Sequence, residues 1–372
     1  MIYCFHAVFS VYFVNMGDDI HAELKKLLNE RIVVLDGAMG TTIREYGLDE
    51  VAARGERFKA IKKDILNNGD ILSITQSDVI GDIHRKFFEA GSDIASTNTF
   101  SATTLAQSEF FVDDPRETGK GVKDQEFFQK IIEDNFLRDL TWEMNYKSAQ
   151  LCKQWADRVS NDCGIKKYVA GSIGPLTVSL SQSPDAEDAA FRTVSFNQVV
   201  DAYIHQIEAL IEGGSDILLV ETIFDGLNAK AASVAIKEVR EKLKINIPII
   251  YSAAVGMGGE TMISAMKIES FINSFEHMKP LALGLNCSLG PDPMRAPLWE
   301  LSSKTDNYVS VFPNAGLPNP LVPSGFDLSP HDMAKYAGEF AAYGLINFVG
   351  GCCGNTPDHI SAIAEAVKKH KP

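Results

Sequence analysis

Positive charge is scarce in this sequence. Lysine and arginine together number 35, against 49 aspartate and glutamate residues, and the formal net charge is −14 at pH 7. A protein that binds the phosphate backbone needs a basic surface, so this balance argues against a nucleic-acid partner. An anionic membrane surface is disfavoured by the same repulsion.

Cysteine is scarce as well. The six cysteines are spread over 372 residues, too few and too scattered for a disulfide framework. This usage is typical of a reducing compartment, so we expect a cytoplasmic protein whose cysteines bind a metal or take part in catalysis. They are Cys4, Cys152, Cys163, Cys287, Cys352 and Cys353.

The chain also lacks a linker rich in proline, glycine or serine, so we predict a single domain over residues 17–372. Residues 1–16 differ from the rest, because the first fifteen contain no Asp, Glu, Lys or Arg. That apolar stretch is too short to span a bilayer comfortably and lacks the basic start and cleavage site of a secretory signal. We predict an N-terminal extension outside the fold, with Met16 opening the native chain. A targeting segment is the alternative.

The rest of the chain alternates short apolar runs with amphipathic stretches. Eight runs have the length and composition of buried strands, and helical patterns lie between them, clearest over residues 197–212. This order favours a parallel (β/α)8 barrel, with a doubly wound open sheet as the alternative. A charged, poorly periodic segment at about 109–140 is predicted to be an insertion after the second strand. The predicted strands are Arg31–Leu35, Asp93–Thr97, Tyr168–Ser172, Asp216–Glu221, Ile247–Ser252, Leu281–Asn286, Tyr308–Phe312 and Leu345–Val349.

Polar residues and cysteines stand at the carboxyl ends of most of these strands. In a barrel of parallel strands the active site lies at that end, so we expect these side chains to share one rim. They are Asp36, Thr97, Asn98, Glu221, Asn286, Cys287, Asn314, Cys352 and Cys353.

The three cysteines of this rim suggest a zinc site. Three thiolates leave the fourth tetrahedral position open, which is typical of catalytic rather than structural zinc. A thiol bound there loses its proton, and the resulting electron-rich sulfur suits attack on a methyl group. The alternatives are that Cys287, Cys352 and Cys353 only fill space, or that the adjacent pair forms a vicinal disulfide.

Two carboxylates and a glycine turn complete the pattern. Asp36 and Glu221 could bind a substrate ammonium group, and the turn at Gly37 and Ala38 offers backbone N–H groups suited to a carboxylate. A thiol-bearing α-amino acid would satisfy the sulfur site, the two acids and the turn together. The alternative for each acid is a salt bridge or helix cap at the barrel rim.

Several segments resemble the homocysteine-binding module of cobalamin-dependent methionine synthases, within the homocysteine S-methyltransferase family. They are LDGAMGT, TNTFSATT, VETIFDGLNAKAA, GLNCSLGPDPMR, FPNAGLPNP and VGGCCGNTPDHI, and the resemblance runs from about Arg31 to Val367. It implies a (β/α)8 barrel in which the three cysteines hold zinc and the zinc binds the homocysteine sulfur.

The resemblance also assigns the rest of the substrate. Asp36 and Glu221 would lie near the amino group, and the backbone of Gly37 and Ala38 would face the carboxylate. Asn98 and Asn286, at the same rim, are predicted to contact the substrate as well.

The methyl donor stays open at this point. Methionine synthases continue into folate-binding and cobalamin-binding modules, and the cobalamin-binding pattern Asp-x-His-x-x-Gly is absent from this sequence. The resemblance therefore implies Zn²⁺ on this chain and cobalamin on a partner module or protein. The alternatives are a standalone methyltransferase that uses S-methylmethionine or betaine, and a module that binds homocysteine or zinc without turnover.

Three segments near the rim depart from the family pattern, and the departures bear on how the methyl donor docks. Ser96 stands where the family has glutamate, and the sequences of residues 174–179 and 259–267 differ from the family's.

Overall fold

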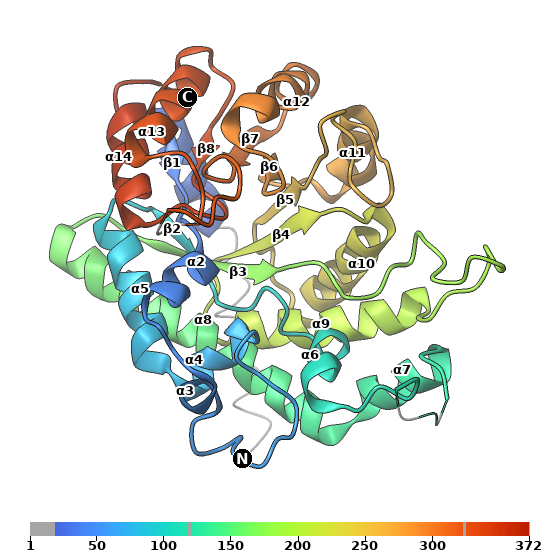
Figure 1. Cartoon of the computed structure of the whole chain (residues 1–372). Coiled ribbons are helices and arrows are strands. Elements are labelled where there is room, and N and C mark those ends of the chain that lie inside the picture. Colours follow the sequence, from blue (N-terminus) through green and yellow to red (C-terminus); the bar gives the residue numbers. More distant parts are fainter. Residues whose placement is uncertain (1–18, 118, 120, 323–324, 372) are drawn as a thin grey trace.

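Eight parallel strands form the centre of the molecule (Figure 1). The computed structural model describes residues 19–117, 119, 121–322 and 325–371, so the predicted extension at 1–16 lies outside the described residues. All eight predicted strands are present, although the first and last are shorter than predicted. The strands are β1 (Val33–Val34), β2 (Ile94–Ser96), β3 (Tyr168–Ile173), β4 (Ile217–Ile223), β5 (Ile249–Ala253), β6 (Ala282–Asn286), β7 (Tyr308–Phe312) and β8 (Phe348–Val349).

The sheet closes into a barrel. Its strand order is β1-β8-β7-β6-β5-β4-β3-β2, and every neighbouring pair is parallel. The remaining gap between β1 and β2 is bridged by the pair Leu35 and Ile94, and the Asp93 N–H donates to the Val34 carbonyl oxygen at 2.7 Å. The predicted (β/α)8 barrel is thus confirmed, and the open-sheet alternative is wrong.

In the described part of the chain, eight helices surround the barrel as a ring (Figure 1). Each packs against the next around the circle, and α14 returns to α5 to complete it. These helices are α5 (Ser77–Glu89), α8 (Asn135–Cys163), α9 (Phe196–Glu212), α10 (Gly226–Leu243), α11 (Ile268–Phe275), α12 (Pro291–Lys304), α13 (Pro330–Ala342) and α14 (Pro357–Val367). The βα connections carry the shorter helices α2 (Met39–Glu45), α3 (Glu50–Arg54), α4 (Leu72–Thr75), α6 (Thr104–Phe111) and α7 (Gln125–Glu133). Two 3₁₀ turns, η1 (Gly69–Ile71) and η2 (Glu276–Met278), lie in the connections.

The strands bury both faces, one toward the helices and one toward the barrel axis. The interior cluster includes Leu219 on β4 and Ile250 on β5. A helix over residues 19–30 adds Ile20, Leu24 and Leu28 to this cluster, so its apolar stripe covers the amino end of the barrel. Toward the carboxyl end the inward positions become polar, and this is where the strand-end residues gather.

The segment predicted as an insertion contains regular structure. Residues 109–140 include the end of α6, the whole of α7 and the first turns of α8, which begins at Asn135. Asp124 and Asp134 cap α7 and α8, accepting from Phe127 N–H and Leu137 N–H respectively.

Among the helices described, none combines the length and apolarity needed to cross a bilayer.

Candidate functional site

Three cysteine sulfurs lie together at the carboxyl end of the barrel. Cys287 follows β6 directly, and Cys352 and Cys353 follow β8 after two glycines. The three Sγ atoms lie within 4.8 Å of one another, and those of Cys287 and Cys353 are 4.0 Å apart. All three are free thiols and half-buried, so the vicinal disulfide is absent from this structure. Within the described residues this is the one group of three metal-binding side chains.

The backbone at both cysteine segments is held in place by its neighbours. The N–H of Cys287 donates to Phe312 O, that of Cys352 donates to Pro313 O at 2.9 Å, and Ala315 N–H donates to Cys353 O at 2.8 Å. Cys287 has φ of 58°, a left-handed conformation that non-glycine residues rarely adopt. Strained backbone of this kind is concentrated at functional sites.

The donor set fits a zinc ion. Tetrahedral Zn–S bonds of about 2.3 Å place two sulfurs about 3.8 Å apart, close to the observed separation of Cys287 and Cys353.

Asn314 follows β7 beside these segments, and its side-chain Oδ1 is buried without a hydrogen-bond partner among the described residues. Its backbone N–H donates to Leu289 O, two residues after Cys287. An orphaned acceptor here is a further sign of a site built for a ligand.

The two predicted carboxylates also face this end of the barrel. Asp36 accepts hydrogen bonds from the Ser96 N–H at 2.8 Å and the Ser96 hydroxyl at 3.1 Å. Glu221 accepts one from the Ser172 hydroxyl at 2.5 Å. Among the described residues neither acid forms an ion pair with a Lys or Arg and neither caps a helix, and the hydrogen bonds that they accept come from Ser96 and Ser172.

Burial controls the protonation of both acids. The pKa of Asp36 is raised to about 7, chiefly by burial and in part by the negative charge of Glu221, while the bonds from Ser96 oppose the shift. Burial likewise raises the pKa of Glu221 to about 7, with an added contribution from Cys287. A bound cation would offset these effects, because it favours the ionised form of each carboxyl.

These raised pKa values predict a pH-dependent stability for the zinc-free protein. Between about pH 4 and 7 the folded state holds protons on Asp36 and Glu221 that the unfolded chain has released. The free energy of unfolding should therefore fall as pH rises through this window, by ~1.4 kcal/mol for each unit of pKa shift. Urea unfolding at pH 5, 6, 7 and 8 should show a flatter profile for Asp36→Asn than for the wild type. If the free energy of unfolding of Asp36→Asn and of the wild type changed equally with pH, the raised pKa of Asp36 would be contradicted.

The turn after β1 is partly occupied by protein contacts. The N–H of Ala38 donates to Asn355 O at 2.9 Å, whereas the N–H of Gly37 has no acceptor among the described residues. A Cβ at Gly37 would lie 2.4 Å from Asn355 O and 2.7 Å from the Phe87 ring, so this position must be glycine. Contact of this turn with a substrate carboxylate stays a prediction.

The two predicted asparagines have protein partners. Asn98 directs its amide nitrogen to Gly69 O at 2.8 Å and to the Ser73 hydroxyl, both in the connection between β1 and α5. Asn286 forms two hydrogen bonds with Thr222 on β4. Their direct contact with substrate stays a prediction. In this structure the Asn98 amide binds the connection between β1 and α5, and the Asn286 amide binds β4.

Sequence reasoning missed the two serines that hold the carboxylates. Ser96 was noted only because the family pattern has glutamate there, yet it donates two hydrogen bonds to Asp36. Ser172 lies in the family-like segment YVAGSIGP but was given no role; it lies on the inward face of β3 because side chains alternate along a strand and Ala170 packs in the interior cluster. That alternation is the signal that could have identified it.

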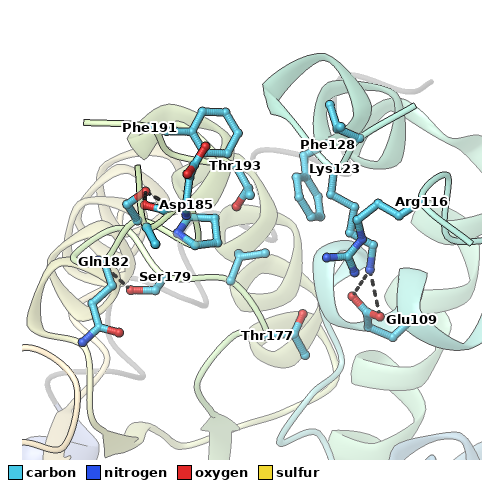
Figure 2. Close-up of a pocket in the computed structure, with 15 residues that line it drawn as sticks. Glu109, Arg116, Lys123, Phe128, Thr177, Ser179, Gln182, Asp185, Phe191 and Thr193 are labelled. Atoms are coloured by element: carbon cyan, nitrogen blue, oxygen red, sulfur yellow. Dashed lines mark hydrogen bonds and ion pairs between the residues drawn. The ribbon is translucent and has the colours of Figure 1, made fainter. Parts of the chain in front are cut away.

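A separate cavity lies outside this site. It has a volume of about 980 Å³ and is bounded by the loop after β3 on one side and by residues around α6 and α7 on the other (Figure 2). Thr177 and Ser179, from the segment that departs from the family pattern, line one wall. On the other wall Lys123 pairs with Glu109 at 2.9 Å. None of the three cysteines or the two rim carboxylates lines this cavity.

The fold and the site together define a (β/α)8 barrel protein with a thiolate cluster beside two buried acids at its carboxyl end. The chain belongs to the homocysteine S-methyltransferase family, whose family model matches residues 33–367. Homocysteine methylation is accordingly its general activity.

Solved structures of one homocysteine methyltransferase have a similar fold. The metallated form of MmuM from Escherichia coli is 18% identical, with a TM-score of 0.65 over 92% of this chain and 98% of that one. The oxidised form of the same enzyme is 19% identical, with a TM-score of 0.61 over 89% and 94% of the two chains. At this identity the likeness concerns the fold.

Proposed function

We propose that this protein binds homocysteine through a zinc ion and presents its sulfur to a methyl group carried by a cobalamin-containing partner, forming methionine. The observation that supports this most directly is the convergence of Cys287, Cys352 and Cys353 beside two acids without a cationic partner. One end of that site suits a thiol, and the other suits an ammonium group.

The cysteines would hold the zinc through three sulfurs. When bound, Zn²⁺ supplies Lewis acidity that lowers the pKa of a substrate thiol while thiolate ligands keep the metal electron-rich. Cys287 is anchored by the strand end of β6, and the other two are anchored by backbone hydrogen bonds to residues 313–315. The sulfurs are therefore presented from two rigid positions of the barrel.

The carboxylates would hold the amino group. Asp36 is fixed by two hydrogen bonds from Ser96, and Glu221 by one from Ser172, so both acids are oriented before substrate arrives. Binding the ammonium group would shift both carboxyls toward their ionised forms. The substrate would then be held at both ends, with its sulfur directed at the methyl donor.

In the methyl transfer the homocysteine sulfur, having released its proton to solvent, forms a bond to the methyl carbon. The bond between that carbon and the donor breaks, and its electron pair leaves with the donor. The product thioether carries no charge and is a weaker ligand than the thiolate, which favours its release.

Methionine formation with three donors in parallel tests this proposal. We expect about one zinc per chain, release of a proton on homocysteine binding, and product with methylcobalamin. Product with S-methylmethionine or betaine alone would overturn the cobalamin assignment and identify a standalone methyltransferase. Binding of zinc and homocysteine without product from any donor would identify a binding module.

A further inference from the structure

One residue of β4 adopts a conformation that is rare for its type. Thr222 has φ of 56°, in the left-handed region, where a β-branched residue is a genuine outlier. It lies in a bulge, since Val220 pairs with Tyr251 and Ile223 with Ala253. Two residues of β4, Glu221 and Thr222, therefore stand opposite a single residue of β5.

The bulge lets Glu221 and Ile223 face opposite sides of the barrel wall. In a regular strand, positions 217, 219, 221 and 223 would all face the barrel interior. Ile217 and Leu219 do pack in the interior cluster, but Ile223 packs in the outer cluster between barrel and helices. The extra residue thus lets Glu221 face Ser172 inside the barrel while Ile223 remains outside. A strand without the bulge would misplace one of the two, because a one-residue slip exchanges the faces.

Asn286, two strands away on β6, holds the bulge through its side-chain amide. Its Oδ1 accepts from the Thr222 N–H at 2.9 Å, and its Nδ2 donates to the Thr222 hydroxyl at 2.8 Å. Asn286 ends β6 and is fully buried, and β5 lies between it and β4. Without this amide the inward Thr222 N–H would lose its acceptor, and the left-handed conformation would lose its support.

We infer that Asn286 is a positioning residue that fixes the left-handed conformation of Thr222 and thereby keeps Glu221 inside the barrel, facing the substrate amino group, while Ile223 packs outside. The same residue precedes Cys287, so one asparagine links the acid on β4 to the sulfur that directly follows β6. The role given to Glu221 rests on the proposed function. The two hydrogen bonds between Asn286 and Thr222, called the clamp below, do not depend on that function.

The test compares Asn286→Ala with the double variant Asn286→Ala/Thr222→Gly. Glycine adopts a left-handed φ without strain, so it should restore the bulge that the missing amide no longer holds. We expect Asn286→Ala to weaken homocysteine binding by about 10–100-fold, since small misplacements of a binding group have effects of this size. The double variant should recover at least ~5-fold of that loss, a gain that a cavity-filling role for Asn286 would not produce.

Two further measurements separate the possible failures. Binding of L-methionine to the same purified proteins, with zinc content measured, tests the amino-acid end of the site without a thiol. Asn347→Ala is the matched control, because Asn347 also accepts from a strand N–H, that of Val309, near the amino end of the barrel. It should lose stability without losing affinity for either ligand.

Three outcomes would overturn the inference. The first is wild-type affinity in Asn286→Ala, and the second is no recovery by glycine at position 222. The third is a wild type that binds neither ligand, which would also contradict the proposed function. In that third case urea unfolding of the same variants still tests the clamp, since the glycine should recover stability in the Asn286→Ala background.

Discussion

Cys353→Ala is expected to abolish stoichiometric zinc binding and to lower methionine formation by at least ~10²-fold. Structural zinc in zinc-finger peptides binds with about 10–16 kcal/mol spread over four ligands, so on that scale one thiolate accounts for about 2.5–4 kcal/mol. Loss of Cys353 leaves Cys287 and Cys352, and two sulfurs cannot fill the tetrahedral set. Zinc content after dialysis against a weak chelator, measured by atomic absorption, reports the effect directly.

Two other cysteines provide controls for this experiment. Cys163 is exposed at the end of α8, and Cys152 is buried in the same helix with its thiol directed at Ala95 O. Cys163→Ala should change neither zinc content nor stability. Cys152→Ala should lower stability through lost packing while zinc content stays at about one per chain. Normal zinc content in Cys353→Ala would refute the ligand assignment.

The barrel was predictable because its strands are buried on both faces and read as short apolar runs. All eight runs became strands in parallel register. The largest errors occurred at β1 and β8, where the predicted runs Arg31–Leu35 and Leu345–Val349 shortened to two residues each, and β2 was also shorter than predicted. The pairing of β1 with β2 is limited to a single bridge between Leu35 and Ile94.

The principal site residues were predictable for a similar reason. Carboxyl ends of parallel strands meet at one rim, so Asp36, Glu221 and the three cysteines could be grouped without knowing the register. The partners of these residues could not be predicted in the same way. Which hydroxyl meets which carboxylate depends on the stagger between strands, as for Ser172 and Glu221. The left-handed Thr222 depends on a bulge and on Asn286, 64 residues away in sequence, and no local pattern marks it.

Glu221→Gln is expected to raise the KM for homocysteine by about 10²-fold with a smaller fall in kcat. Glutamine keeps an oxygen that can accept from the Ser172 hydroxyl, so the barrel should fold normally. The variant removes one of the two negative charges proposed to bind the ammonium group. Truncating one partner of a buried charge pair costs about 2–5 kcal/mol of binding, and about 2.7 kcal/mol corresponds to 10²-fold. Steady-state kinetics over a range of homocysteine concentrations, at saturating donor, separate the two parameters.

Asp70→Asn is the matched control for charge removal. Asp70 is also buried, its pKa is also raised to about 7 by burial, and it accepts from the Ser101 N–H. It lies in the connection between β1 and α5, however, and the charge of Glu221 does not contribute to its pKa as it does for Asp36. Asp70→Asn removes a buried carboxyl that is not proposed to contact homocysteine, so its KM for homocysteine should stay within about twofold of the wild type. Equal increases in KM for Asp70→Asn and Glu221→Gln would mean that Glu221 acts through general electrostatics of the barrel rather than by contacting the amino group.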